Sequence, residues 1–184
     1  MKKTFLCLVL CLAAFIVFNY RCAHEHDEET YLEQLERRMT CADWQTHYEP
    51  AYGYEMRSLS CFRPVENDGE GSLRFAYVEE TPLKSIMYIT LETATQPCRD
   101  SLNPALEIRE IAREMGGVCI RKSDSTYLVT AELKSRDPKV TAYRMNAKYV
   151  LRQKLWFVET LIYPEDFAPA VRRLVDEVNR WHPF

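Results

Sequence analysis

Polar and charged side chains alternate along one predicted strand in the second half of the chain, and they are the best candidates for a binding site. Arg144, Asn146 and Lys148 occupy every second position, so they project from one face of that strand. Glu92 and Glu132 lie on two other predicted strands and are expected to share this face. Mixed charges on neighbouring antiparallel strands often form stabilising pairs. A recessed face would instead give a polar groove for a peptide or small ligand, and both interpretations stay open.

Three aromatic residues of predicted strands, Tyr88, Tyr127 and Trp156, are candidates to line such a groove. Aromatic side chains on strands more often belong to the hydrophobic core, because each buries a large apolar area. Arg172, Arg173 and Arg180 fall on the predicted outer side of the last helix. We interpret these arginines as a solvated helix face, with attraction to an anionic membrane or partner as the alternative.

The chain contains no standard catalytic motif. GxSxG, GxGxxG and the P-loop pattern are all absent. His24 and His26 precede three acidic residues, which are residue types that bind divalent ions, but we interpret 24–29 as a solvated linker. His47 and His182 stand beside aromatic residues and are typical of packing or surface histidines. The sequence therefore predicts no catalytic residue, metal or cofactor.

The first 23 residues have the character of a targeting segment. Two lysines precede an uncharged apolar run over residues 5–18. A membrane-spanning helix needs about 20 such residues, so this run fits the apolar region of a signal peptide better. Cleaved export, an uncleaved membrane anchor and atypical lipidation at Cys22 remain open. Each predicts that residues 24–184 form one domain outside the cytosol, in the periplasm or anchored facing it.

Charge and cysteine content change once residues 1–23 are set aside. Residues 24–184 carry 21 basic and 27 acidic side chains, a net charge of −6, which argues against nucleic-acid binding. Four of the seven cysteines remain, namely Cys41, Cys61, Cys98 and Cys119. An exported protein with an even number of cysteines permits disulfides, but a domain of this size can fold without them, which favours buried free thiols. No CxxC spacing occurs, so a zinc site is not predicted.

Hydrophobic periodicity divides the domain into helices and strands. Apolar residues at helical spacing predict helices over 28–44, over 104–115 and through 171–178. β-branched, aromatic and alternating segments predict strands at 52–56, 73–77, 86–93, 118–121, 127–133, 141–151 and 155–163, with loops at 64–72 and 95–103. Short links between the strands favour antiparallel pairing. The predicted fold is α+β: a mostly antiparallel sheet of six to seven strands, covered by N-terminal, central and C-terminal helices.

This order of elements, with three local features, resembles the PsbP-like superfamily. The features are Tyr52-Gly53-Tyr54 in an early strand, a central helix after a strand and loop, and a closing strand hairpin that runs through Tyr163-Pro164 into a terminal helix. The superfamily includes the extrinsic PsbP protein of photosystem II, a small Ran-binding protein of yeast and exported bacterial proteins. The resemblance implies a PsbP-like sandwich that docks or assembles with partners and performs no catalysis. A cystatin-like cone is the alternative fold.

Taken together, these patterns predict an exported cell-envelope protein that binds an unidentified partner protein or small ligand without catalysis. Two alternatives remain. An envelope hydrolase would require Glu92, Glu132 or His47 to converge in a concave pocket. A structural component of a membrane complex would use residues 1–23 for membrane attachment.

Overall fold

The computed structural model describes residues 30–66, 69–80, 86–135, 140 and 142–184. Its contacts divide the chain into residues 1–34 and a compact unit of residues 35–184. The targeting segment, the 24–29 linker and Cys22 lie outside the described residues. Among those described, no helix is both long and apolar enough to cross a membrane.

Helix α2 (Tyr31–Cys41) begins with a capping box. The Thr30 backbone N–H donates to Glu33 Oε2 at 2.7 Å, and the Glu33 N–H donates to Thr30 Oγ1 at 3.3 Å. These two bonds satisfy backbone donors that have no partner inside the helix.

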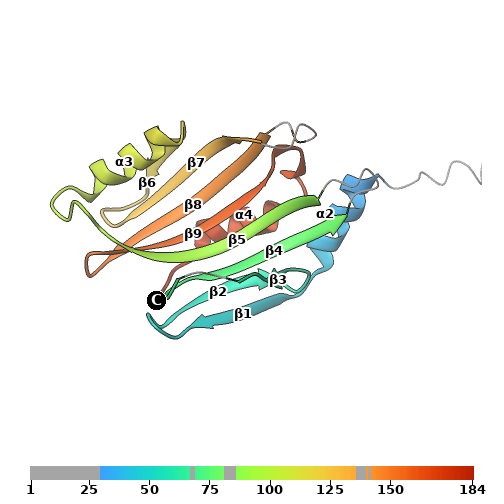
Figure 1. Ribbon diagram of the computed structural model, residues 1–184, viewed down its shortest axis with the longest axis horizontal. Coiled ribbons are helices and arrows are strands. Elements are labelled where there is room, and N and C mark those ends of the chain that lie inside the picture. The colour runs from blue at the N-terminus through green and yellow to red at the C-terminus, as the bar shows by residue number, and fades with distance from the viewer. Residues whose placement is uncertain (1–29, 67–68, 81–85, 136–139, 141) are drawn as a thin grey trace, which may run out of the picture. The chain divides into compact units, whose positions relative to one another are not determined.

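A seven-stranded antiparallel sheet forms the centre of the compact unit (Figure 1). Its spatial order is β3-β4-β5-β9-β8-β7-β6, and every neighbouring pair is antiparallel. The strands are β3 (Arg63–Pro64), β4 (Leu73–Glu80), β5 (Ile86–Pro97), β6 (Val118–Arg121), β7 (Thr126–Lys134), β8 (Ala142–Arg152) and β9 (Leu155–Pro164). The predicted α+β class and antiparallel sheet are confirmed.

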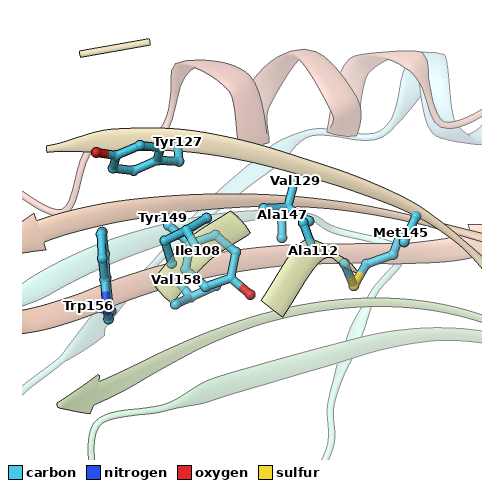
Figure 2. Close-up of a cluster of buried hydrophobic side chains, with 10 residues drawn as sticks. Ile108, Ala112, Tyr127, Val129, Met145, Ala147, Tyr149, Trp156 and Val158 are labelled. Carbon is cyan, nitrogen blue, oxygen red and sulfur yellow. The ribbon is translucent and has the colours of Figure 1, made fainter. Parts of the chain in front are cut away.

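Helix α3 (Pro104–Glu114) packs on one face of this sheet, here called the α3 face. The helix contributes Ile108 and Ala112 to a buried cluster (Figure 2). The strands contribute Tyr127, Val129, Ala131, Met145, Ala147, Tyr149, Trp156 and Val158. Tyr127 and Trp156 are therefore core residues, as the more common role of strand aromatics suggested, whereas the side chain of Tyr88 lies outside the described residues.

The opposite face of the sheet is covered by helix α4 (Arg172–Arg180) and by a separate antiparallel hairpin of β1 (Trp44–Glu49) and β2 (Tyr54–Leu59). We call this the α4 face. Trp181, just after α4, donates its indole N–H to the Glu55 carbonyl at 2.8 Å. Tyr54 donates to Thr93 Oγ1 on β5 at 3.0 Å. A closing helix on β8 and β9 agrees with the predicted sandwich and departs from the cystatin-like alternative.

Several element boundaries differ from the predictions. Helix α2 ends at Cys41, and Trp44 opens β1, a strand that was not predicted. The helical spacing of Leu35, Met39 and Ala42 masked this change, because Ala42 continues the apolar pattern beyond the last turn. Strand β5 continues to Pro97 through a segment predicted as loop, and β3 forms a short edge next to β4. A short 3₁₀ helix, η1 (Glu165–Phe167), follows β9.

The predicted end of α3 at a glycine pair is confirmed. Gly116 has φ +66°, a left-handed conformation that glycine adopts without strain. A Cβ on Gly117 would lie 2.5 Å from the Thr130 carbonyl oxygen, so no other residue fits without a shift of β7. The two glycines thus turn the chain directly from α3 into β6.

Candidate functional site

The alternation of β8 places Arg144, Asn146 and Lys148 on the α4 face, as its sequence pattern predicts. Glu132 of β7 is paired with Arg144 in the register and shares this face. Arg144 makes its ion pair elsewhere, with Oε1 of Glu165 at 2.9 Å. Asn146 donates from Nδ2 to the hydroxyl of Tyr163 at 3.1 Å.

Glu92 does not share this face, so its predicted grouping with Arg144 and Lys148 is wrong. It is paired with Thr160, which is paired with Ala147 in the core of the α3 face. Glu92 Oε2 instead lies 3.3 Å from Nε of Arg74. Strand β9 lies between β5 and β8, so its register with each of them decides which β5 side chains share a face with Arg144 and Lys148. The sequence does not show that register.

The α4 face contains two separate hollows where helix α4 does not cover it. The first has a volume of about 310 Å³ and includes three of the five predicted site residues. Its lining residues are Gly116, Gly117, Val118, Thr130, Ala131, Glu132, Arg144 and Asn146. We call it the edge hollow, because β6 is the last described strand on that side of the sheet.

The second hollow has a volume of about 600 Å³ and contains Lys148. It lies between the β6–β7 turn and the C-terminal end of α4, and we call it the turn pocket. The remaining lining residues are Lys122, Ser123, Ser125, Thr126, Leu128, Asn179 and His182. The predicted polar face is therefore divided into two sites of different composition.

Lys148 is only 4% exposed, whereas Asn146 on the same face of β8 is half-buried and Arg144 is exposed. Its Nζ donates to the backbone carbonyl of Asn179 at 3.0 Å, in the last turn of α4. An ammonium group is favourable there because the carbonyl groups at a helix C-terminus carry partial negative charge. Burial lowers the pKa of Lys148, while the neighbouring Glu159 acts in the opposite direction.

Glu159 is a buried acid that the sequence analysis did not select. It is 0% exposed on β9, cross-strand from Lys148, and neither carboxyl oxygen has a hydrogen-bond partner in the described structure. Burial raises its pKa well above the ordinary value, Glu177 raises it further, and Lys148 only partly offsets this. The available signal was a single acidic residue within an otherwise apolar and aromatic strand.

The residues named for the hydrolase alternative do not converge. Glu92 lies on the α3 face and Glu132 on the α4 face. The Nε2 atom of His47 is hydrogen-bonded to Ser58 Oγ at 2.8 Å, and its ring stacks on Phe75 with 4.0 Å between centroids. His47 is therefore a packing residue between the hairpin and the sheet. No cluster of three or more potential metal ligands occurs among the described residues.

The four cysteines of the domain are free thiols in the structure. Cys98 has the most specific environment, with Sγ 3.2 Å from Oε2 of Glu107. Burial raises the pKa of Cys98 to about 11, and Glu107 contributes to the rise. A thiol with so high a pKa is a poor nucleophile at neutral pH.

Arg173 is not part of a solvated face, in contrast to the prediction for the last helix. One of its terminal nitrogens lies within hydrogen-bond distance of the carbonyls of Met39, Thr40 and Ala42, at 2.7, 2.6 and 3.1 Å. It therefore binds the C-terminal end of α2. Arg172 and Arg180 are exposed, as predicted.

Comparison with solved structures finds a similarity to cyanobacterial PsbP (CyanoP) from Synechocystis sp. PCC 6803. The two chains are 15% identical, the match covers 78% of this chain and 94% of that one, and the TM-score is 0.48. No protein-family model and no curated protein sequence matches the chain.

Proposed function

We propose that this protein is a non-catalytic, exported binding module that holds an extended segment of a partner protein along β6 and the edge hollow. The observation that carries the proposal is the grouping of Glu132, Arg144 and Asn146 in one hollow beside an exposed apolar edge strand. Export is inferred from the basic and apolar character of residues 1–23.

Strand β6 has the properties of a peptide-binding edge. Val118 is 61% exposed and Ile120 47% exposed, and both project from the α4 face beside the hollow. Lys122 N donates to Thr126 O, so antiparallel alternation directs the backbone groups of Cys119 and Arg121 away from β7. An added strand pairs with such groups, while adjacent pockets select its side chains.

The composition of the edge hollow favours a segment with mixed polarity. Arg144 and Glu165 form an ion pair in which each side chain is nearly half exposed, so its net contribution to stability is small. A charged side chain of a bound segment can therefore exchange for one member of the pair at little cost. Val118 and Ile120 supply the apolar contact area that a polar hollow lacks.

Site-specific photo-crosslinking in the native host tests the proposal. We expect a crosslinker at Val118 to capture a discrete partner, and the adduct to disappear when Arg144→Glu and Ile120→Asp are introduced together. A crosslinker at Val78, an exposed valine of β4 on the other face, is the matched control. Equal adducts at both positions, or adducts at Val118 that survive both substitutions, would overturn the proposal.

The intact mass of the protein from its host tests the export proposal separately. Cleavage near residue 23 removes three basic residues and leaves a domain of net charge −6. Retention of an unmodified N-terminus together with recovery from the cytosolic fraction would contradict export.

A further inference from the structure

The turn pocket is a second candidate binding site, separate from the β6 edge. It shares no lining residue with the edge hollow. At about 600 Å³ it falls within the range of small-molecule sites. Its lining contains two lysines, one histidine, three hydroxyl side chains and no carboxylate.

Lys148 is the buried cationic residue that lines this pocket. Its ammonium group has three N–H donors, and the Asn179 carbonyl is the single partner found for them among the described residues. The other two donors belong to a residue that is only 4% exposed and lines the cavity. A buried cation with unused donors favours an anionic ligand, because leaving such a group unpaired is costly.

Two of the three acids near Lys148 and the pocket are paired with arginines. Asp124 lies in the β6–β7 turn, but its carboxylate is paired with Arg121. Glu159 lies cross-strand from Lys148 but does not line the pocket, and burial raises its pKa well above the ordinary value. Glu177 of α4 makes its ion pair with Arg57 at 3.2 Å. The lining of the pocket therefore holds two lysines and no acidic side chain.

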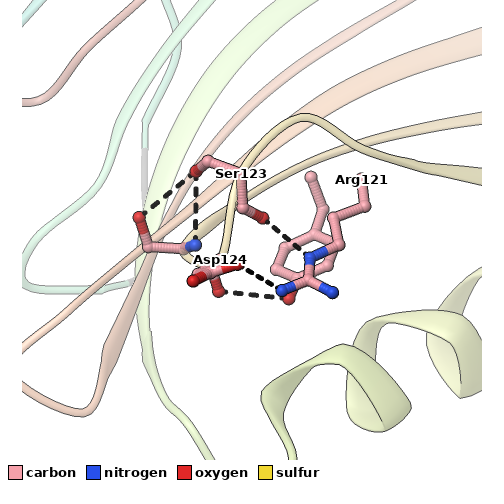
Figure 3. A network of polar contacts seen from close by, with 5 residues as sticks. Arg121, Ser123 and Asp124 are labelled. Carbon is pink, nitrogen blue, oxygen red and sulfur yellow. Dashed lines mark hydrogen bonds and ion pairs between the residues drawn. The ribbon is translucent and has the colours of Figure 1, made fainter.

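The β6–β7 turn is held in place by its own polar contacts, shown in Figure 3. Arg121 donates from Nε to the Ser123 carbonyl at 3.2 Å and pairs with Asp124. The Ser125 N–H donates to Ser123 Oγ at 3.3 Å. These bonds fix the turn before any ligand arrives, so binding does not have to order it.

We propose that the turn pocket binds the phosphate group of a small phosphorylated molecule. Two ammonium groups, from Lys122 and Lys148, match the two negative charges of a phosphate monoester. The hydroxyl groups of Ser125 and Thr126 and the imidazole of His182 supply further donors around it. Lys148 holds the end of α4 and the ligand at the same time, through different N–H groups.

Calorimetric titration of the full domain with inorganic phosphate at pH 7 tests the site. We expect saturable binding, a fall in affinity of about tenfold for Lys122→Gln, since one lost charge contact of about 1.4 kcal/mol corresponds to that factor, and a smaller fall for His182→Gln. Both residues are exposed, so neither substitution is expected to disturb folding. Lys134→Gln, at an exposed lysine of β7 outside the pocket, is the matched control and should bind phosphate normally.

Lys148→Met tests the buried cation, provided that its thermal transition shows a folded protein. We expect phosphate binding to be lost. If this variant does not fold, Lys122→Gln and His182→Gln still decide the outcome. No saturable binding to the parent protein, or an equal loss in Lys134→Gln, would overturn the proposal.

Further titrations identify the source of the phosphate group. Glycerol 3-phosphate that binds more tightly than inorganic phosphate supports a free metabolite. Binding to phosphatidic acid vesicles without binding to glycerol 3-phosphate supports a lipid headgroup. Acetate that binds as tightly as phosphate contradicts phosphate selectivity. Failure of the β6 crosslinking experiment leaves these results unaffected, because the two surfaces share no residue.

Discussion

Glu159 is an unusual residue because an acidic group without a hydrogen-bond partner normally destabilises a protein interior. It lies at 0% exposure beneath α4, and both oxygens are unpartnered. Burial, followed by the charge of Glu177, raises its pKa well above 4.5. The folded protein therefore holds this proton at pH values where the unfolded chain has lost it.

The first prediction concerns the pH dependence of stability. The contribution of a raised pKa is fully present below the unfolded value near 4.5 and is lost as pH rises through the folded value. Relative to Glu159→Gln, the wild-type protein should lose up to about 1.4 kcal/mol per pH unit across that window. Urea unfolding of both proteins between pH 4 and 8 measures the difference. Glu165→Gln, at a partly exposed acid, is the control, and parallel curves for wild type and Glu159→Gln would contradict the prediction.

Glu107 is also a buried acid, but its pKa is lowered, whereas that of Glu159 is raised. Its Oε2 accepts from Cys98 Sγ, from the Arg99 and Asp100 backbone N–H groups and from the indole of Trp156, at 3.0 to 3.3 Å. Burial acts to raise its pKa, but these hydrogen bonds outweigh that effect and the pKa is lowered. The carboxylate thus joins α3 to the end of β5 and to the core.

The second prediction uses Cys98 to report on this carboxylate. Glu107→Gln removes a negative charge that helps to raise the pKa of Cys98 to about 11, so the thiolate should form more readily. We expect faster alkylation of Cys98 by iodoacetamide, measured by peptide mass spectrometry. Glu110→Gln, at an exposed position of the same helix, should leave the rate unchanged. An unchanged rate in Glu107→Gln would show that burial alone protects the thiol.

These residues show what a single sequence can and cannot reveal about a site. Alternation along β8 correctly placed Arg144, Asn146 and Lys148 on one face, because the period of a strand is local. The position of Glu92 required the register of two further strand pairs, and the prediction was wrong. The burial of Lys148 depends on α4, which lies about 30 residues away in the chain and covers only one end of β8.

At the scale of elements, the end of α2 is determined by a contact from a distant helix. Arg173 of α4 binds three carbonyls around residues 39–42, and its guanidinium also lies 5.2 Å from the ring centre of Trp44. The apolar spacing of this region continues past the true helix end. Local periodicity therefore predicted a helix to residue 44, whereas a tertiary contact stabilises an end at Cys41.

The third prediction is that Arg173→Gln destabilises this junction. Hydrogen bonds from a charged donor are worth about 1.5–3 kcal/mol, so we expect a loss of that order in the free energy of unfolding. Amide exchange should rise at residues 39–44 before it rises in β8 or β9. Arg172→Gln, at the exposed neighbouring arginine, is the control. Equal stability of the two variants would mean that the helix end is held by local packing.

At the scale of the whole domain, the antiparallel sheet and the helices that cover it were predicted from patterns that the sequence displays clearly, whereas the spatial order of the strands was not. Long alternating or β-branched segments identified β4, β5, β7, β8 and β9, and two regular apolar helices identified α3 and α4. Of the β1–β2 hairpin, only a strand overlapping β2 was predicted and β1 was not, because the packing partners of the hairpin are elsewhere in the chain. Tyr54 contacts Phe157 and Trp181, with ring centroids 5.8 and 6.1 Å apart.

Trp181, which directly follows α4, connects the end of this helix to the hairpin. Its indole N–H binds the Glu55 carbonyl, and its ring joins Tyr54, Val150 and Phe157 in a buried cluster on the α4 face. The hairpin pairs with no strand of the main sheet, since β1 and β2 form a separate two-stranded sheet. An isolated hairpin is marginally stable in water, so packing against the sheet, including this cluster and the stacking of His47 on Phe75, stabilises it.

The fourth prediction is that the hairpin unfolds locally when Trp181 is removed. Trp181→Ala should cost about 3–5 kcal/mol, as truncation of a buried aromatic usually does. Amide exchange at residues 54–59 should become fast while β8 and β9 remain protected, because these two strands keep their neighbours in the main sheet and the core of the α3 face. Trp181→Phe keeps the ring but loses the bond to Glu55, and it should cost about 1 kcal/mol. Arg180→Ala, at the exposed preceding residue, should change neither measurement, and uniform loss of protection across the sheet in Trp181→Ala would show that the hairpin and sheet unfold as one unit.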